Sequence, residues 1–245
     1  MSTINIVIPM AGAGGRFENA YTKPKAFIDV LGKPMIVRVL ENLSCKNARY
    51  ILIARDEHMR MERELVQEIE QGYDVVFHPI GHLTEGAACT VLHARKFINN
   101  DDPLIIANSD QIVDIHFEDY VNDCLERDLN GSIMTFKDPE KNTKWSFART
   151  NSSGLVEEVR EKVPISDLAT VGIYMFSSGK DYVNAAIDMI VQNDRVNNEF
   201  YVCPVYNYAI KNGNSIGVYD IPFDAMHGIG TPDDLNTYFD YLHHI

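Results

Sequence analysis

Short apolar runs alternate with segments of helical spacing in the first half of the chain. The runs are typical of strands buried on both faces, and the segments between them carry apolar residues three and four positions apart. The predicted strands are residues 4–8, 50–54, 74–78 and 103–107, and the predicted helices are residues 35–43, 57–70 and 86–97, the last with Thr84 as its cap. This alternation predicts a mostly parallel central sheet with helices on both faces.

The second half has a different pattern, in which strands separated by turns dominate. The predicted strands are residues 133–137, 145–150, 155–161, 170–176 and 215–220, and the predicted helices are residues 180–192, 201–211 and a last one from Pro232. Residues 151–154, Asn-Ser-Ser-Gly, predict a hairpin turn, and Thr231 is the expected cap of the last helix. We expect a mixed-sheet extension of the same sheet and a single domain over residues 1–245, because no linker-like stretch separates the halves.

The composition limits the classes of partner that the protein is expected to bind. The net charge of −13 over 245 residues argues against nucleic acid or an anionic membrane as a main partner. No apolar run approaches the length of a membrane span, and the first residues enter a strand without a basic leader, so a cytoplasmic location is expected. The four cysteines lack the paired spacing of a zinc site or a disulfide framework.

A glycine-rich segment, residues 10–16, follows the first predicted strand directly and reads Met-Ala-Gly-Ala-Gly-Gly-Arg. Glycines let backbone N–H groups approach phosphate without a Cβ in the way, and Lys25 follows within a short distance. The segment favours a nucleotide site; an ordinary glycine turn is the alternative. It lacks the Gly-Lys-Ser/Thr end of a Walker loop, and Phe17 stands where a dinucleotide-binding motif has its third glycine.

A second polar segment, Asn108-Ser109-Asp110, follows the fourth predicted strand. The carboxyl ends of parallel strands meet at one edge of a sheet, so we expect this segment beside the glycine-rich one. A carboxylate at this edge suits Mg²⁺, which binds one or two carboxylates together with phosphate oxygens. Asp110 is therefore the predicted metal ligand, and a turn aspartate that caps the next segment is the alternative.

With several further motifs, these segments resemble the nucleotidylyltransferases that make nucleotide-activated sugars and related compounds. The further motifs are Lys23-Pro24-Lys25, residues 32–35, Glu161-Lys162, residues 171–174, residues 198–200 and residues 228–235. The resemblance covers nearly the whole chain and implies a Rossmann-like three-layer αβα fold. It also implies transfer of a nucleoside monophosphate from a nucleoside triphosphate to a phosphorylated acceptor, with pyrophosphate as the leaving group.

The start of the chain, residues 8–12, and the segment 227–232 resemble the branch of this family that supplies capsule and surface polysaccharides. That branch includes a cytidylyltransferase that acts on phosphoglutamine. The resemblance therefore favours CMP transfer from CTP over transfer from UTP, to a sugar 1-phosphate or a phosphoglutamine-like acceptor. Residues 1–130 would bind mainly the nucleotide, and residues 131–245 mainly the acceptor.

The resemblance also implies roles for single residues. The implied catalytic residues are Arg16 on the β- and γ-phosphates, Lys25 on the α-phosphate and acceptor phosphate, and Asp110 on Mg²⁺. The residues implied to bind the nucleotide are Met10, Ala11, Gly12, Ala13, Gly14, Gly15, Gly81, Glu85, Gly86, Ala87, Asn108 and Ser109. The residues implied to contact the acceptor, with Glu161 beside them, are Lys162, Thr170, Gly172 and Glu199.

Each of these assignments has a simpler alternative. Lys25 and Lys162 could be solvated lysines, the segment 81–87 an ordinary helix start, and Gly172 a strand glycine beside a bulge. Many relatives also carry a second aspartate where this chain has Gly228. A glycosyltransferase is a rival that the missing Asp-X-Asp motif weakens, and a non-catalytic nucleotide-binding module is another. The residues leave a homo-oligomer open.

Overall fold

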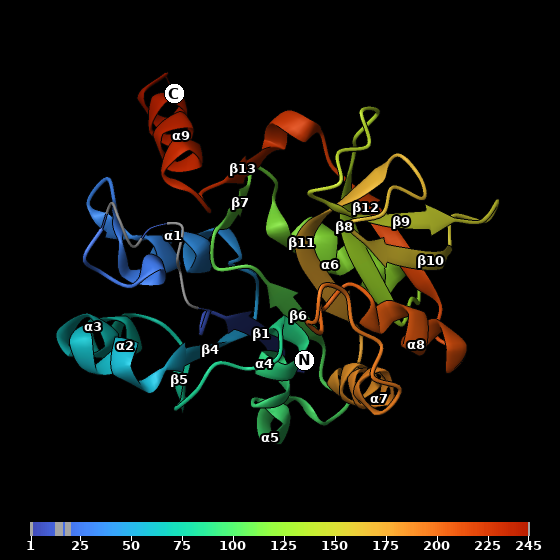
Figure 1. Cartoon of the computed structure of the whole chain (residues 1–245), viewed down its shortest axis with the longest axis horizontal. Helices are drawn as coiled ribbons and strands as arrows, with labels where there is room; N and C mark the ends of the chain where they lie inside the picture. The colour runs from blue at the N-terminus through green and yellow to red at the C-terminus, as the bar shows by residue number, and fades with distance from the viewer. Residues whose placement is uncertain (1, 13–16, 18–20, 245) are drawn as a thin grey trace.

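The computed structural model describes residues 2–12, 17 and 21–244. Within this part, nine strands form one sheet, in the order β10-β9-β11-β6-β1-β4-β5, with β8 joining β11 to β12. These strands are β1 Ile4–Pro9, β4 Ala48–Arg55, β5 Val75–Ile80, β6 Leu104–Ala107, β8 Gly131–Lys137, β9 Ser146–Thr150, β10 Val156–Glu161, β11 Leu168–Phe176 and β12 Ile216–Asp220. Figure 1 shows the sheet running across the molecule.

The predicted fold class is confirmed. Strands β6, β1, β4 and β5 are parallel neighbours, as the alternation of apolar runs and helices indicates. Strand β11 then pairs antiparallel with β6, β8 and β9, while β12 runs parallel to β8. The sheet is therefore parallel around β1 and mixed beyond β6.

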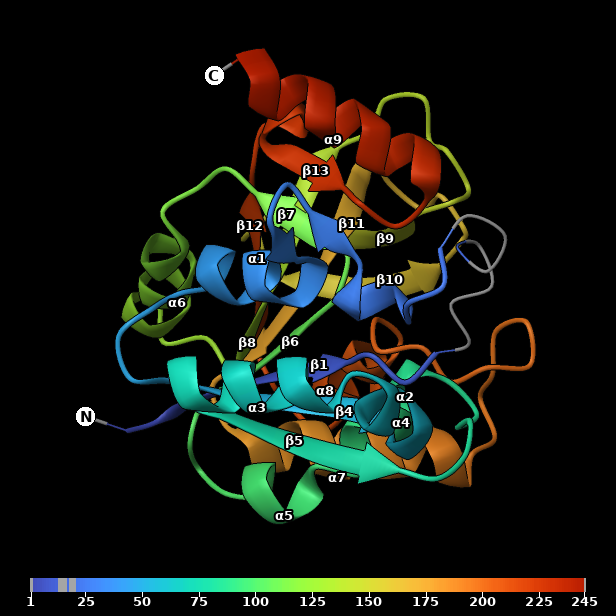
Figure 2. The same cartoon turned by 90° about the vertical axis from the view of Figure 1, so that its left-hand side faces the viewer.

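Helices cover both faces of this sheet, because alternate strand residues point to opposite faces. In β1, Ile4, Ile6 and Ile8 enter one core and Val7 enters the other. The first core is covered by α1 Met35–Asn42, α3 Arg63–Gly72, α6 Phe117–Glu126 and α9 Pro232–His244. The second is covered by α4 Ala87–Leu92, α5 Arg95–Ile98, α7 Gly179–Val191 and α8 Val205–Lys211. Figure 2 shows α1 and α9 on one side of the sheet and α5 and α7 on the other.

Two predicted helices are interrupted. The prediction for residues 57–70 becomes α2 Asp56–Met61 and α3, because Glu62 leaves the helical region at φ −112° and ψ 36°. The prediction for residues 86–97 becomes α4 and α5. Thr84 is not its cap: Gly86 takes the N-cap position at φ 126°, and the Thr84 hydroxyl donates to the Gly86 carbonyl instead.

Short elements complete the fold near the carboxyl ends of the parallel strands. They are η1 Lys25–Phe27, β2 Asp29–Val30, β3 Lys33–Pro34, β7 Gln111–Val113, η2 Phe223–Ala225 and β13 Met226–Gly228. Strand β13 pairs antiparallel with β7, which follows β6 closely. This pairing carries the segment before α9 back to the end of β6. The part of the chain that the structure describes has no helix long and apolar enough to cross a membrane.

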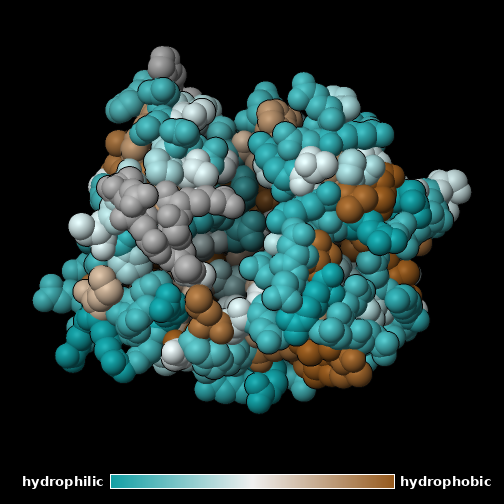
Figure 3. Space-filling model, viewed as in Figure 1, coloured by the Kyte–Doolittle hydropathy of each residue, from teal (hydrophilic) through white to brown (hydrophobic). Residues whose placement is uncertain are grey.

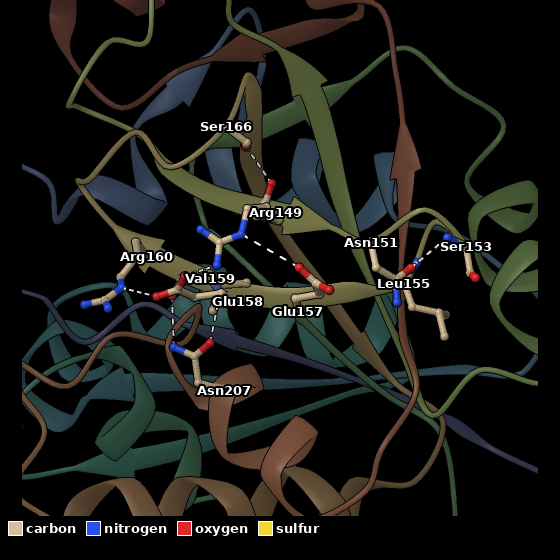
Figure 4. Close-up of polar contacts among 11 residues, drawn as sticks. Arg149, Asn151, Ser153, Leu155, Glu157, Glu158, Val159, Arg160, Ser166 and Asn207 are labelled. Atoms are coloured by element: carbon tan, nitrogen blue, oxygen red, sulfur yellow. Dashed lines mark hydrogen bonds and ion pairs between the residues drawn. The ribbon is translucent and has the colours of Figure 1, made fainter.

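The outer edge of β10 is closed by a side chain rather than by another strand. The backbone N–H of Val159 donates to Asn207 Oδ1 at 2.9 Å, and Asn207 Nδ2 donates to the Val159 carbonyl at 2.9 Å (Figure 4). Asn207 lies on α8 and replaces both ladder hydrogen bonds of a missing neighbour. Edge strands with unpaired N–H and C=O groups can pair with other chains, so this contact also protects the edge.

Substituting Asn207→Ala should lower the free energy of unfolding by about 1 to 3 kcal/mol, because two backbone groups of a strand lose their partners. Urea unfolding followed by circular dichroism measures this loss. Asn212→Ala is the matched control, since Asn212 ends the same helix and bonds only to the exposed Asp188 carboxylate. Its effect should stay within about 0.5 kcal/mol. Equal losses in the two variants would contradict the role given to Asn207.

Candidate active site

A cavity of about 880 Å³ opens where β1, β4 and β6 end. The predicted site residues that line it are Met10, Gly12, Lys25, Asn108, Ser109 and Asp110. Figure 3 shows the molecule hollowed between its two halves on this view, with mostly hydrophilic residues visible around the hollow. The expectation that the segments after β1 and β6 lie together is thus met by the geometry.

Lys25 and Asp110 form a direct ion pair between Lys25 Nζ and Asp110 Oδ2. Their side chains are 22% and 23% exposed, so the pair faces the cavity while most of it is shielded from water. Lys25 comes from η1 and Asp110 from the turn after β6, 85 residues apart in sequence. The Lys25 ammonium also lies 5.8 Å from the ring centre of Phe17, within the range of a cation–π contact.

Gly230 lies directly against this ion pair. A Cβ on Gly230 would lie 2.6 Å from Asp110 Oδ2 and 3.8 Å from Lys25 Nζ, so only glycine fits without a displacement. The backbone N–H of Ile229 donates to the Asp110 carbonyl at 2.9 Å, which holds the segment in place. The chain after β13 therefore forms one wall of the cavity beside Lys25 and Asp110.

The glycine-rich segment lies only partly within the described residues. Ala13, Gly14, Gly15 and Arg16 lie outside them. Met10 and Ala11 are nearly buried, and the Met10 N–H donates to the Ile53 carbonyl of β4 at 2.9 Å. The beginning of the segment is thus fixed beside the end of β4.

The segment predicted to meet the base is bonded to the second half of the chain. The Phe200 N–H donates to the Glu85 carbonyl at 2.8 Å, and the Ala88 N–H donates to the Phe200 carbonyl at 3.0 Å. A Cβ on Gly86 would lie 2.4 Å from the Phe200 oxygen, so this approach requires glycine. The Glu85 carboxylate accepts a hydrogen bond from Arg195 at 2.7 Å. Neither Gly81 nor Glu85, Gly86 or Ala87 lines the 880 Å³ cavity.

The residues predicted to contact the acceptor also lie outside this cavity. Lys162 Nζ donates to the Tyr201 hydroxyl at 3.1 Å, and this hydrogen bond raises the pKa of Lys162. Thr170 is buried with its hydroxyl 3.1 Å from the Tyr174 hydroxyl. The charge of Glu199 acts on both Lys162 and Glu161. Glu161 is 7% exposed and accepts a hydrogen bond from Ser146, and burial raises the pKa of its carboxyl.

Gly172 connects the two groups of residues. It lies in β11 at φ 95°, and its carbonyl accepts a hydrogen bond from the Asn108 N–H at 3.2 Å. A Cβ at this position would lie 2.2 Å from Asn108 Nδ2. The β11–β8 register shifts between Thr170 and Tyr174, so Gly172 lies at an irregularity of the strand.

The cavity is also lined by Arg55, Glu57 and His58, which the sequence analysis did not single out. Arg55 is the last residue of β4, whose carboxyl end lies at the same edge as those of β1 and β6, and the other two lie in α2. The rule that identified Asp110 could have found them. Arg55 forms an ion pair with Glu57. Burial, and then the charge of Arg55, lower the pKa of His58.

Gly228 lies where the resemblance implies a second aspartate. Within the described residues, a Cβ on Gly228 would lie 4.0 Å from Asp234 Cγ, and Asp234 is engaged with Thr231 at the start of α9. His227 pairs with Asp114 at 2.7 Å and stacks on Tyr241. Among the described residues, no three His, Cys, Asp or Glu side chains converge on a position that could hold a metal.

Comparison with known proteins decides the family. Residues 6–241 match the family model described as nucleotidyl transferase. The chain belongs to the nucleotidyl transferase family. It is 27% identical over 179 residues to a mannose-1-phosphate guanylyltransferase catalytic subunit beta of Danio rerio, covering 70% of this chain and 49% of that protein. The corresponding Drosophila melanogaster protein is 26% identical over 179 residues, covering 70% and 47%. The chain thus spans about half the length of these curated relatives.

Solved structures share the fold of this nucleotidyl transferase family member over nearly its whole length. A nucleoside-diphosphate-sugar pyrophosphorylase from Vibrio cholerae RC9 has a TM-score of 0.80 at 24% identity, covering 96% of this chain and 99% of that one. An inositol-1-phosphate CTP transferase from T. maritima has a TM-score of 0.77 at 13% identity, covering 99% and 96%. At these identities the similarity concerns the fold.

Substituting Gly172→Ala should lower the free energy of unfolding by about 2 to 5 kcal/mol. The new Cβ has to overcome a positive φ, at roughly 1 to 2 kcal/mol, and the contact with Asn108, at roughly 1 to 3 kcal/mol. Gly154→Ala separates the two effects, because Gly154 has φ 76° with no atom within 4 Å of a Cβ. Gly154→Ala should lose only the roughly 1 to 2 kcal/mol that the positive φ costs, measured by the same urea unfolding. A Gly172→Ala loss no larger than that of Gly154→Ala would refute the close contact.

Proposed function

We propose that this protein is a Mg²⁺-dependent nucleotidylyltransferase, which transfers a nucleoside monophosphate from a nucleoside triphosphate to a small phosphorylated acceptor. The observation that carries the proposal is the contact between Lys25 and Asp110 in the cavity at the ends of β1, β4 and β6. A cation and a carboxylate held together beside a glycine-rich segment suit a reaction between two polyanions. Family membership supports the same class of reaction.

The proposed reaction is an in-line displacement at the α-phosphorus. An oxygen of the acceptor phosphate forms a bond to this phosphorus, the bond to the bridging oxygen of the β-phosphate breaks, and its electron pair leaves with pyrophosphate. A phosphate monoester is largely ionised at neutral pH, so the attack needs no base from the protein. The protein has to position two anions that repel each other and neutralise the charge between them.

In this scheme Lys25 stabilises the charge that develops at the α-phosphate and the acceptor phosphate. Backbone N–H groups of residues 12–15 and the Arg16 guanidinium would bind the rest of the triphosphate. Lys162 would bind the acceptor through its phosphate or an attached group, and Glu199 and Thr170 would contact the acceptor further. The hydrogen bond that Lys162 donates to the Tyr201 hydroxyl orients the Lys162 ammonium.

Asp110 fits a Mg²⁺ ion because it offers a carboxylate at the edge where the triphosphate would lie. Mg²⁺ keeps several waters and is commonly bound by one or two carboxylates plus substrate phosphates, so the single carboxylate suffices. When bound, the ion neutralises part of the triphosphate charge. Asp110 is the residue that would hold the ion, beside Lys25.

We further propose CTP, ahead of UTP, as the nucleotide, and a sugar 1-phosphate or phosphoglutamine-like acceptor. The support is the resemblance of residues 8–12 and 227–232 to enzymes of surface-polysaccharide synthesis. Precursors of that kind are made in the cytoplasm, which is the location we propose. The curated relatives carry guanylyltransferase names, so GTP belongs in any test.

A matrix of nucleoside triphosphates and phosphorylated acceptors, with pyrophosphate release as the readout, tests the proposal. CTP, UTP, GTP, ATP and dTTP are each combined with phosphoglutamine and several sugar 1-phosphates. Release that requires both substrates, with a nucleotide-linked acceptor as the second product, supports it. Release of a nucleoside diphosphate from a nucleotide sugar would indicate a glycosyltransferase. Nucleotide binding without turnover in every combination would indicate a non-catalytic module.

Substituting Lys25→Ala should reduce kcat roughly 100- to 1,000-fold, as expected when a preorganised charge at the transition state is removed. The steady-state rate of pyrophosphate release measures this loss. Lys33→Ala is the matched control, because Lys33 forms an exposed ion pair with Glu41 and does not line the cavity. It should leave kcat unchanged. A Lys25→Ala enzyme with near-normal turnover and an intact fold would remove Lys25 from the mechanism.

Removal of divalent metal with EDTA should abolish turnover, and added Mg²⁺ should restore it. Asp110→Asn should raise the Mg²⁺ concentration needed for half-maximal activity by roughly tenfold or more, because a neutral amide oxygen binds the ion more weakly. Asp114→Asn serves as the control, since Asp114 pairs with His227 and Tyr241 outside the cavity. An unchanged Mg²⁺ requirement in Asp110→Asn would exclude Asp110 as the ligand.

A further inference from the structure

Arg55, Glu57 and His58 have no part in the mechanism above, yet they line the same cavity as Lys25 and Asp110. None of the residues predicted to meet the base at 81–87, or the acceptor, lines that cavity. The cavity is therefore the part of the site shared by the glycine-rich segment, Lys25 and Arg55. Three cations, Lys23, Lys25 and Arg55, line it against two carboxylates, Glu57 and Asp110, so the charge of the lining favours an anionic ligand group.

Strand order places Arg55 across β1 from Asp110. Asp110 follows β6 on one side of β1, and Arg55 ends β4 on the other side. Neighbouring strands lie about 4.8 Å apart, so the two strand ends are separated by roughly 10 Å. The glycine-rich segment begins between them, where the Met10 N–H bonds to Ile53, two residues before Arg55. An anion that crosses the end of β1 with one end at Lys25 and Asp110 has its other end near Arg55.

The partner of Arg55 is easily replaced. Glu57 is 57% exposed, whereas Arg55 is 25% exposed. An ion pair with such an exposed carboxylate is weak, and the Glu57 side chain can turn into water when Arg55 binds another anion. A guanidinium binds phosphate oxygens through two parallel hydrogen bonds, which are stronger than a pair with a solvated carboxylate.

His58 packs beside this pair without competing for the anion. Its Nε2 lies 3.7 Å from Glu57 Oε1, and its side chain is 14% exposed. Burial and the neighbouring Arg55 lower the pKa of His58, so its imidazole is mainly neutral at neutral pH. Of the residues that α2 and the end of β4 place at the cavity, Arg55 is the cation and Glu57 is its carboxylate partner.

We propose that Arg55 binds the β- and γ-phosphates of the nucleotide and then the leaving pyrophosphate, and that Glu57 holds the guanidinium in place until phosphate oxygens displace it. This assignment rests on the proposed nucleotidyl transfer. Arg55 takes no part in bond formation or cleavage. It stabilises the end of the triphosphate on which negative charge increases as the bond to the α-phosphorus breaks.

Arg–Glu pairs elsewhere in the chain provide a comparison. Arg149 and Arg160 both donate to Glu158 at 2.6 Å on β9 and β10, and their side chains are 47% and 59% exposed (Figure 4). They do not line the cavity. Arg149 therefore shares the ion-pair chemistry of Arg55 without its surroundings, which makes Arg149→Gln the matched control.

The test measures binding of inorganic pyrophosphate with Mg²⁺ by isothermal titration calorimetry, independently of turnover. Arg55→Gln should weaken pyrophosphate binding roughly 10- to 100-fold, since hydrogen bonds to charged groups are lost. Arg55→Lys should lose less, because it keeps the charge without the bidentate geometry. Binding of the nucleoside monophosphate, which lacks the two outer phosphates, should stay unchanged in both variants, and Arg149→Gln should bind pyrophosphate like the wild type.

Glu57→Gln should change the affinity for pyrophosphate in the opposite direction. This test does not require the Arg55 variants to be stable. Removing the carboxylate that competes for Arg55 should tighten pyrophosphate binding several-fold. Arg55 would be excluded if Arg55→Gln folds and binds pyrophosphate as the wild type does, or if Glu57→Gln weakens binding.

The same series separates this proposal from the proposed reaction. A wild type that releases pyrophosphate in the substrate matrix, with unaltered pyrophosphate affinity in Arg55→Gln, would overturn the role of Arg55 alone. A wild type that binds pyrophosphate through Arg55 but turns over no substrate pair would end the proposed reaction and retain the anion site. A wild type that does not bind pyrophosphate at all would overturn the site itself.

Discussion

The parallel pairing of β6, β1 and β4 is the constraint on which the site depends. Parallel strands end at the same edge, where Asp110 follows β6, the glycine-rich segment follows β1, and Arg55 ends β4. Charged side chains that are distant in sequence are thus brought close together by the parallel pairing of the strands alone. In a protein with a net charge of −13, this convergence supplies the local cations that a phosphate ligand needs.

The two halves of the chain approach each other closely at three glycines. Gly172 lies against Asn108, Gly86 against the Phe200 backbone, and Gly230 against Asp110. Each contact would place a Cβ closer than 3 Å to a neighbouring atom. Gly86 meets backbone atoms, whereas Gly172 and Gly230 meet the side chains of Asn108 and Asp110. Backbone hydrogen bonds beside two of these contacts, from Asn108 to Gly172 and from Ile229 to Asp110, also join the two halves. These glycines thus serve the packing of the two halves.

The sequence predicts the sheet well because its central strands are short, continuous apolar runs, which are typical of strands buried on both faces. Helix interruptions are harder to predict from the sequence. Glu62 separates α2 from α3 because its backbone is not helical, and glutamate has no residue preference that would indicate this. Helix α6 was missed although Phe117, Tyr120, Val121 and Cys124 have helical spacing. The division of roles between residues 1–130 and 131–245 stays a prediction, as do the roles of the site residues.

Within the site, Asp110 was predictable and Arg55 was not found, although the same rule applies to both. Asp110 follows an apolar run as an isolated acid, whereas Arg55 begins a run of charged residues, Arg-Asp-Glu-His, that resembles an ordinary solvated helix start. Arg55, Glu57 and His58 of this run line the cavity, whereas Asp56 does not. Which side chains of such a run face the cavity depends on the placement of α2, which residue type alone does not reveal.

Gly228 has a physical consequence for the same edge. With glycine there, and with Asp234 bonded to Thr231 at the start of α9, Asp110 is the carboxylate that this edge presents next to Lys25. One carboxylate already paired with an ammonium holds Mg²⁺ weakly unless phosphate oxygens complete the coordination. In the reaction we propose, the metal site would therefore be incomplete without the nucleotide, and metal and triphosphate would stabilise each other on the protein. A second carboxylate would bind the metal more strongly but would add repulsion where the two proposed anionic substrates have to meet.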